Sequence, residues 1–228
     1  SVGHGLGATP DLVIVKKTSG VGAWYVGGAA LGSTGANGNH LVLNTLAAQV
    51  GESNILWGGG QTFNDTTFGL GGWDVVNRNG DSYIAYCFKS IDGYSKIGSY
   101  VGLGSGGNPV IVTGFRPAFV MIKNTTTGST SWVIADNRRG YADLYANVAD
   151  AEFASGSLYG AHFLSNGFTF ATADISRNAS NNTYIFLAIA EEGLPYVTRN
   201  ATNPFGDASE LALYKFEDNA TDAEGNHS

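Results

Sequence analysis

One stretch of this chain occurs twice, about 107 residues apart. Residues 7–16 and residues 114–123 share a Gly, a Pro, a Val and a Lys at the same spacing, and a Trp follows each stretch, Trp24 in the first copy and Trp132 in the second. A Tyr-Ile pair then closes each copy, at residues 83–84 and 184–185. A repeat this long exceeds a solenoid unit, so it predicts two related modules or one domain with internal pseudo-symmetry.

The composition favours many short strands joined by tight turns. Of 228 residues, 33 are Gly, and only 14% are charged, whereas about 25% is typical of globular domains. Ser, Thr and Asn lie between short apolar runs, which is a pattern of strands and turns rather than of long helices. We therefore predict an all-β fold, built from two related antiparallel β-sandwich-like modules that arose by internal duplication.

Strand-like runs occur in the same order in both copies. In the first copy they are Leu12–Lys17, Trp24–Val26, His40–Asn44, Phe63–Phe68, Trp73–Asn77 and Ser82–Lys89. In the second copy they are Ala118–Lys123, Trp132–Asp136, Ala161–Leu164, Phe168–Ala171 and Thr183–Ala190, and the runs Lys96–Val101 and Val110–Thr113 lie between the copies. Two Asn-Gly pairs, at residues 79–80 and 166–167, predict tight turns.

The predicted organisation has five parts: a first module at 1–101, a Gly-rich connector at 102–109, a second module at 110–192, a linker at 193–209, and the start of a further domain at 210–228. The connector formally matches the G-x-G-x-x-G dinucleotide motif through Gly102, Gly104 and Gly107. That motif must open a helix, but here a β run follows, so we expect a flexible connector and no cofactor.

The charge distribution excludes two classes of partner. The net charge is −7, of which −5 falls in residues 205–228, so the rest of the chain is nearly neutral. It has no basic stripe for nucleic acid and no apolar run long enough to insert in a membrane. Cys87 is the only cysteine, which rules out an internal disulfide, and its apolar surroundings predict a small buried side chain.

Aromatic residues in polar loops are the main binding signal. Trp57, Tyr94, Tyr141 and Tyr159 each lie beside Gly, Ser, Asn or Asp, where a flat ring can contact the apolar face of a sugar. Arg138 and Arg139, close to Tyr141, form the one compact basic spot and suit an anionic sugar. The alternative for these residues is packing against the sheet, pairing with a nearby Asp, or burial in a subunit interface.

Catalytic residues are less evident. A polysaccharide depolymerase would need two converging carboxylates, and the candidates are Asp136, Asp143, Asp150 and Glu152. No nucleophile motif accompanies the single cysteine or the serines. We therefore expect a protein that is not an enzyme.

The C-terminal segment contains a strand-like run, Leu211–Phe216, and an oxygen-rich turn after it. Asp218 and Asp222 in this turn are candidate calcium ligands, although their spacing is not that of an EF-hand. An Asx-rich turn that satisfies its own backbone is the alternative. No other metal or cofactor is expected.

Several motifs together carry a resemblance to a known family. They are Gly-x-x-Pro-x-x-Val at residues 7–13, the segment Gly80–Phe88, the segment Gly93–Tyr100, and Thr113–Pro117. This set resembles an uncharacterised β domain of tailed-bacteriophage virion proteins, found in tail-fibre, adhesin and other appendage proteins, over roughly residues 2–192. The segment from Leu211 resembles the opening strand and turn of a concanavalin-A-like (laminin-G-like) lectin domain, which implies that the chain belongs to a longer protein.

The resemblance implies a virion location and a role in attachment or assembly. We expect a non-enzymatic structural protein of the virion, a tail-fibre or spike segment that takes part in attachment to a host-surface glycan. A purely structural capsid or tail decoration without a ligand is the alternative, and a polysaccharide depolymerase is a second one. Low charge and exposed sheet edges favour a homo-oligomer that contacts other virion proteins, and the analogy with phage fibres suggests a trimer.

Overall fold

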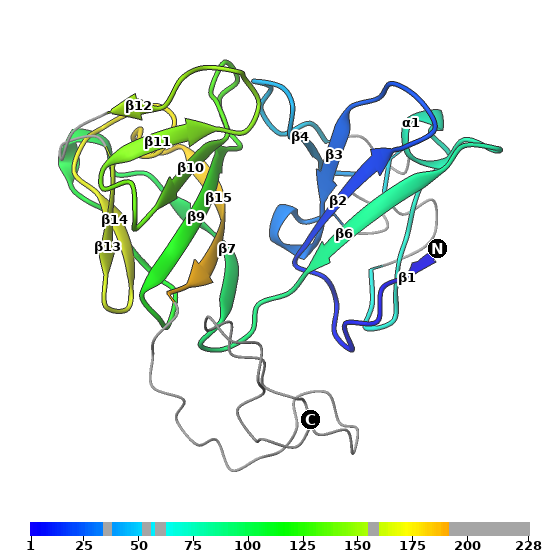
Figure 1. Cartoon of the computed structure of the whole chain (residues 1–228), viewed down its shortest axis with the longest axis horizontal. Helices are drawn as coiled ribbons and strands as arrows, with labels where there is room; N and C mark the ends of the chain where they lie inside the picture. Colours follow the sequence, from blue (N-terminus) through cyan, green and yellow to red (C-terminus); the bar gives the residue numbers. More distant parts are fainter. Residues whose placement is uncertain (34–37, 52–55, 58–62, 155–159, 192–228) are drawn as a thin grey trace, which may run out of the picture. The chain divides into compact units, whose positions relative to one another are not determined.

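The computed structural model describes residues 1–33, 38–51, 56–57, 63–154 and 160–191. Most of the described residues in regular structure lie in antiparallel strands (Figure 1), so the predicted all-β class is confirmed. Ser1–Glu192 form one compact unit. The predicted linker at 193–209 and the lectin-like start at 210–228 lie outside the described residues. No described helix is long and apolar enough to cross a membrane.

A four-stranded antiparallel sheet forms the centre of the first half, in the order β4-β3-β2-β6. Its strands are β2 (Leu12–Lys17), β3 (Trp24–Gly27), β4 (Leu41–Val42) and β6 (Tyr83–Phe88). The first four residues of β2 are apolar and all buried, as expected of a strand covered on both faces. The strands predicted here are confirmed, with β4 limited to the centre of the predicted run.

A six-stranded antiparallel sheet forms the centre of the second half, in the order β12-β11-β10-β9-β15-β7. Its strands are β7 (Ser95–Val101), β9 (Pro117–Asn124), β10 (Val133–Asp136), β11 (Ala142–Tyr145), β12 (Phe153–Ala154) and β15 (Thr183–Ala190). The sequence predicts that β7 belongs to the first module, but β7 pairs with β15 along its whole length. The predicted module boundary at Val101 therefore does not separate the two sheets.

Two small sheets complete the strands. β1 (Val2–Gly3) pairs with β5 (Thr67–Phe68), and β8 (Val110–Val112), β13 (Ala161–Leu164) and β14 (Gly167–Phe170) form a sheet in the order β13-β14-β8. The hairpin predicted at Asn166-Gly167 is confirmed. The strand predicted at Phe63–Phe68 shrinks to β5 because the Asn64 side chain accepts the Thr66 and Thr67 N–H groups, which bends the chain into a turn.

The two main sheets share their strand register. Lys16 in β2 is paired with Trp24 on one side and with Ile84 on the other. In the sequence repeat, Lys123 of β9 is equivalent to Lys16 and Ile185 of β15 is equivalent to Ile84. These two residues are paired in the second sheet as well.

A matched pair of hydrogen bonds accompanies this register. The Trp24 N–H donates to Asn44 Oδ1 at 2.9 Å, and the Trp132 N–H donates to Asn147 Oδ1 at 2.7 Å. Both asparagines follow the strand that pairs next to the tryptophan strand. Internal duplication stays a prediction, and these shared contacts support it.

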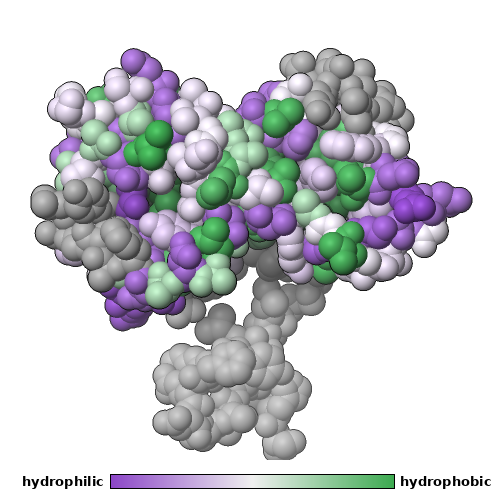
Figure 2. Space-filling view, turned by 90° about the horizontal axis from the view of Figure 1, so that it is seen from above, coloured by the Kyte–Doolittle hydropathy of each residue, from purple (hydrophilic) through white to green (hydrophobic). Residues whose placement is uncertain are grey.

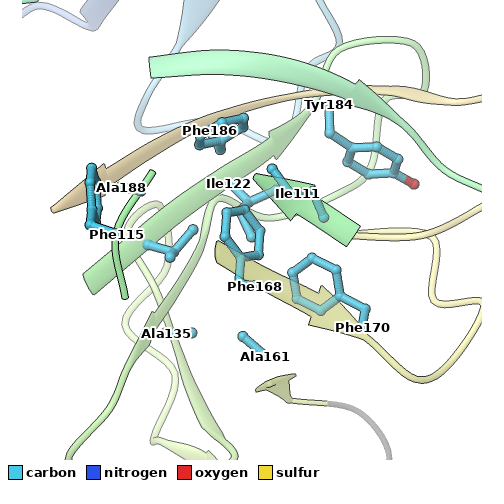
Figure 3. Packing of buried hydrophobic residues seen from close by; sticks show 11 residues of the cluster. Ile111, Phe115, Ile122, Ala135, Ala161, Phe168, Phe170, Tyr184, Phe186 and Ala188 are labelled. Atoms are coloured by element: carbon cyan, nitrogen blue, oxygen red, sulfur yellow. The ribbon is translucent and has the colours of Figure 1, made fainter. Parts of the chain in front are cut away.

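Three clusters of buried residues stabilise the unit. The largest aromatic one lies between the six-stranded sheet and the β13-β14-β8 sheet (Figure 3), where Phe168 and Phe186 pack edge to face. A second cluster draws on both main sheets, with Leu12 and Ile14 from one and Met121 and Leu187 from the other. The third lies on the opposite face of β2. Burial of apolar surface in these clusters supplies the main stabilisation of the fold.

The first and third clusters belong to one half each, whereas the second joins them. On the face drawn in Figure 2, hydrophobic surface residues are interspersed with hydrophilic ones. Most of the apolar side chains of the described strands thus pack in the three clusters, and a few remain exposed at the surface.

The predicted strand at Trp73–Asn77 is wrong, because these residues form a single helical turn, α1 (Asp74–Asn77). The N–H groups of Val76 and Asn77 both donate to the Trp73 carbonyl. Trp73 and Val76 are three residues apart, so a helical turn brings both onto the third cluster, whereas a strand would place them on opposite faces.

The predicted flexible connector at 102–109 is also wrong, because side-chain and backbone bonds anchor it. Buried Asn178 accepts the Leu103 N–H at 2.8 Å and donates to the Gly107 carbonyl at 3.2 Å. The Gly102 N–H donates to the Asn182 carbonyl at 2.8 Å. A Cβ at Gly102 would lie 2.2 Å from a backbone oxygen, so glycine is needed here for close approach, not for flexibility.

Candidate functional site

Three of the six candidate binding residues, Tyr94, Arg138 and Arg139, lie at one end of the six-stranded sheet. β9 begins at this end, and β10 and β15 end there, because neighbouring strands are antiparallel. A pocket of about 500 Å³ opens at this end. Its lining residues are Ala118, Asp136, Asn137, Arg138, Arg139, Ala190 and Glu191. The predicted basic spot at Arg138 and Arg139 is thus part of a pocket formed by the ends of three strands.

Asp136 organises the turn that carries both arginines. Its Oδ1 accepts the backbone N–H groups of Arg138 and Arg139, each at 2.9 Å, which is the geometry of an Asx turn. Burial alone would raise the pKa of Asp136, but these two bonds and the Arg139 guanidinium outweigh burial and lower the pKa. Asp136 is therefore negatively charged near neutral pH.

Arg139 is held in place by two carboxylates. Its Nε lies 2.6 Å from Asp136 Oδ2, and its Nη1 lies 2.8 Å from Glu152 Oε2. Hydrogen bonds to Glu152 and then to Asp136 raise the pKa of Arg139 further above its ordinary value. Two of the five N–H donors of Arg139 thus bind carboxylates of the protein itself, which fixes the loop.

Glu191 also lines the pocket and is also paired. Its Oε1 accepts a hydrogen bond from the Asn137 amide at 2.6 Å, and its Oε2 lies 2.8 Å from Arg116 Nε. Sequence reasoning missed Arg116, Asn137 and Glu191 as site residues. Arg116 precedes Pro117 at the start of β9, Asn137 follows β10, and Glu191 follows β15. Antiparallel pairing brings these three strand ends together, and this is the signal that the sequence offers for them.

Arg138 differs from the other charged residues of the pocket. Its side chain is exposed, and within the described ranges no carboxylate lies at ion-pair distance from it. Its backbone is fixed by Asp136, so only the side chain is free to move. A guanidinium offers up to five N–H donors and binds carboxylate or phosphate groups with two parallel hydrogen bonds.

Tyr94 lies beside this pocket. Its side chain is 58% exposed, and its backbone carbonyl accepts the N–H of Ala190, one of the pocket-lining residues. The Tyr94 N–H donates to the Ile91 carbonyl, which fixes the tight turn before β7. The structure therefore brings Tyr94, Arg138 and Arg139 to the same end of the sheet, from segments more than forty residues apart in the sequence.

Two of the other candidates do not join them. Trp57 is fully buried, packs against Phe63 with ring centroids 5.8 Å apart, and belongs to the third hydrophobic cluster, so its assignment as a ligand-contacting loop residue is wrong. Tyr141 is exposed but does not line the pocket, and its ring lies 4.9 Å from the His162 ring. Tyr159, Asp218 and Asp222 lie outside the described residues.

Three of the four carboxylates proposed for a depolymerase have structural partners, and the fourth, Asp150, is exposed. Asp143 is fully buried and lies 2.6 Å from Arg177 Nη1. Asp136 and Glu152 both bind Arg139. Within the described part of the chain, no group of three or more His, Cys, Asp or Glu side chains is arranged to hold a metal ion.

These observations define an all-β domain with an arginine-containing pocket at one end of its larger sheet. Residues 1–193 match the model of a family described as a domain of unknown function (DUF7483), and the chain belongs to this family. No curated protein and no solved structure matches the chain.

Proposed function

We propose that this protein is a non-enzymatic structural protein of a bacteriophage virion, a tail-fibre or spike segment on the particle surface that takes part in attachment to a host-surface glycan. The observation that carries the binding part of this proposal is the exposed Arg138 guanidinium, fixed at its backbone and without an acidic partner among the described residues. The resemblance of the repeated motifs to virion appendage proteins supports the location. A homo-oligomer in contact with other virion proteins is part of the same proposal.

The pocket favours a glycan that contains an acidic sugar. The carboxylate of such a sugar would receive two hydrogen bonds from Arg138. Asp136 and Glu191 retain acceptor capacity for sugar hydroxyls, because an ionised carboxylate has about four lone-pair sites. Tyr94 is one strand away and offers an exposed ring for the apolar face of a neighbouring sugar.

The same residues favour binding over hydrolysis. A glycosidase needs one carboxylic acid with a raised pKa to protonate the leaving group. The pKa of Asp136 is lowered, and Glu152 is engaged with the Arg139 guanidinium. This pair is suited to hold a cation in place, which supports a protein that retains the glycan intact.

A purely structural module without a ligand is the second candidate. The burial of Trp57 favours it, because one aromatic residue expected to face a ligand is instead part of the core. Under this alternative, Arg138 would contact an acidic group of a neighbouring virion protein.

The test is binding of carboxylated polysaccharides to the wild type and to Arg138→Gln. A matched control is Arg78→Gln, because Arg78 is also an exposed arginine but lies between α1 and β6 and does not line the pocket. We expect Arg138→Gln to weaken binding about tenfold or more, since hydrogen bonds to charged groups contribute about 1.5–3 kcal/mol. Chemical reduction of the sugar carboxylates should have the same effect on the wild type.

Two outcomes would contradict the proposal. Equal binding by Arg138→Gln and the wild type would exclude this pocket as the glycan site. Absence of binding to every acidic and neutral glycan tested, together with particles that lose stability when Arg138 is replaced, would favour the purely structural role.

A further inference from the structure

β6 is the last strand of the four-stranded sheet, and no other described strand pairs with its outer edge. The Asp11 N–H donates to the Phe88 carbonyl and the Thr18 N–H donates to the Ser82 carbonyl, so the even-numbered residues of this segment bond to β2. In an antiparallel pair, the backbone N–H and C=O groups of the alternate residues point to the opposite edge of the strand. The N–H and C=O groups of Tyr83, Ala85 and Cys87 therefore face outward, and no bond joins them to other described residues.

The equivalent edge in the six-stranded sheet is covered. The shared register makes Tyr184, Phe186 and Ala188 of β15 the counterparts of Tyr83, Ala85 and Cys87. These three residues are paired with the antiparallel strand β7. The second half thus contains a strand at the position where the described residues place none beside β6.

The open edge also leaves apolar side chains exposed. Ile84 is 41% exposed and Tyr86 is 43% exposed, whereas their counterparts Ile185 and Leu187 are 3% and 7% exposed. The Tyr86 ring stacks on Trp24 with centroids 6.3 Å apart, which holds it on the surface of the sheet. An unpaired edge with apolar side chains is a ready template for another strand.

We propose that β6 of a second copy of this chain occupies this edge, related to the first by a two-fold axis beside Ala85. A two-fold axis makes the two strands antiparallel, which is the direction of β7 on β15. Centring the pair on Ala85 places Tyr83 opposite Cys87 of the second copy. Every outward-facing residue then meets another outward-facing residue, and each such pair can exchange two hydrogen bonds.

The side chains suit this register. Ile84 lies opposite Tyr86 of the second copy, so the two exposed apolar residues cover each other in a close, non-hydrogen-bonded pair. Beyond the strand ends, Asp81 lies opposite Lys89 of the second copy, so no like charges face each other. The result is one continuous sheet of eight strands across the two copies.

This inference does not depend on the pocket at Arg138, which lies in the other sheet. The experiment measures the mass of the full chain by sedimentation and light scattering over a broad concentration range. We expect a dimer for the wild type and a dissociation constant raised at least about tenfold in Ala85→Pro. Proline at this position removes an outward N–H and blocks the edge but does not break the ladder to β2.

Ser99→Pro is the matched control. The Gly102 N–H donates to the Asn182 carbonyl and the Ala190 N–H donates to the Tyr94 carbonyl, so the even-numbered residues of the β7 segment bond to β15. The backbone N–H of Ser99 in β7 therefore faces outward, at the edge of the other sheet. This variant should dimerise like the wild type. A monomer at all concentrations, a trimer, or a dimer that Ser99→Pro disrupts and Ala85→Pro does not would overturn the proposal.

A second variant keeps the test decisive if Ala85→Pro fails to fold. Tyr83→Cys places a thiol opposite Cys87 of the second copy, where a disulfide can form because paired Cα atoms lie about 5.5 Å apart. Within one strand the two cysteines are four residues apart, about 13 Å, and cannot join. Oxidation should give a covalent dimer, and mixing isotope-labelled and unlabelled copies should show the bond between chains. The wild type, with Cys87 alone, should stay uncrosslinked; no crosslink in the folded variant would count against this register.

Discussion

The indole of Trp57 lies directly against Gly27, so that a Cβ added to Gly27 would stand 2.3 Å from Trp57 Cε2. Gly27 ends β3, and Trp57 pairs with Leu70 in an isolated bridge, so the contact joins the sheet to a loop far along the chain. The absence of a side chain at Gly27 is what allows Trp57 to be fully buried.

Replacing Gly27 with Ala should destabilise the protein by about 2–3 kcal/mol, because overpacking of a filled core costs about 1–3 kcal/mol or more. Urea unfolding followed by tryptophan fluorescence measures the change. Gly72→Ala is the control, since a Cβ there meets nothing within 4 Å and the exposed position needs no rearrangement. Equal stability of the Gly27→Ala variant and the wild type would show that the indole can move aside without loss.

Replacing Asp143 with Ala should destabilise the protein by about 3–5 kcal/mol, which is the usual effect of removing one partner of a buried ion pair. The reason is that Arg177 is almost fully buried beside it and would lose its closer carboxylate, at 2.6 Å, and keep only Asp174, at 3.3 Å. Asp150→Ala, at an exposed position, is the control and should change the free energy of unfolding by less than about 0.5 kcal/mol. A loss for Asp143→Ala no larger than for the control would mean that Asp174 alone can satisfy Arg177.

The sequence predicts the central strands well and the pocket only in part. β2, β9 and β15 are continuous apolar runs flanked by turn residues, and local pattern is enough to place them. The pocket depends on which strand ends meet. Arg138 and Arg139 were recognised because two adjacent arginines are visible in the sequence, whereas Arg116 and Glu191 become neighbours only through the pairing of β9 with β15.

The failures have a common physical cause. Polar and Gly-rich neighbours predict an exposed loop position for Trp57 and a flexible connector at Gly102–Pro109. In the structure both depend on residues far away in the sequence. Trp57 packs against Gly27, which has no side chain, and Asn178 forms hydrogen bonds to the connector. Local composition predicts that a segment is irregular, but it does not predict whether tertiary contacts bury or anchor it.

Replacing Asn178 with Ala should release the connector. The variant would lose the acceptor of the Leu103 N–H and the donor to the Gly107 carbonyl, and a buried group left without a partner costs about 1–3 kcal/mol. We expect the amide of Leu103 to exchange with solvent much faster, measured by hydrogen exchange. Asn178→Asp provides the comparison, because its carboxylate can still accept the Leu103 N–H; unchanged exchange in Asn178→Ala would contradict the anchoring role.

Lys123 should make the stability depend on pH in the alkaline range. Its side chain is fully buried, and burial lowers the pKa of its amine from 10.5 to about 8. Nζ donates to the Thr130 carbonyl and hydroxyl at 2.7 and 2.8 Å, and no carboxylate among the described residues pairs with it. Below pH 8 the folded and unfolded states both carry the proton. Above pH 8 the folded state releases it first, so the unfolded state binds more protons and the free energy of unfolding rises with pH.

The measurement compares the wild type with Lys123→Met from pH 7 to 9.5. Cys87 and Tyr100 oppose the rise at the upper end, because burial raises their pKa values, but both residues are present in the two proteins and their effects cancel in the difference. We expect the wild type to gain about 1–2 kcal/mol relative to Lys123→Met over this range, since one pH unit changes the free energy by at most about 1.4 kcal/mol for one proton. Parallel profiles would mean that Lys123 keeps its ordinary pKa, and therefore that water reaches the amine at its place beside Thr130.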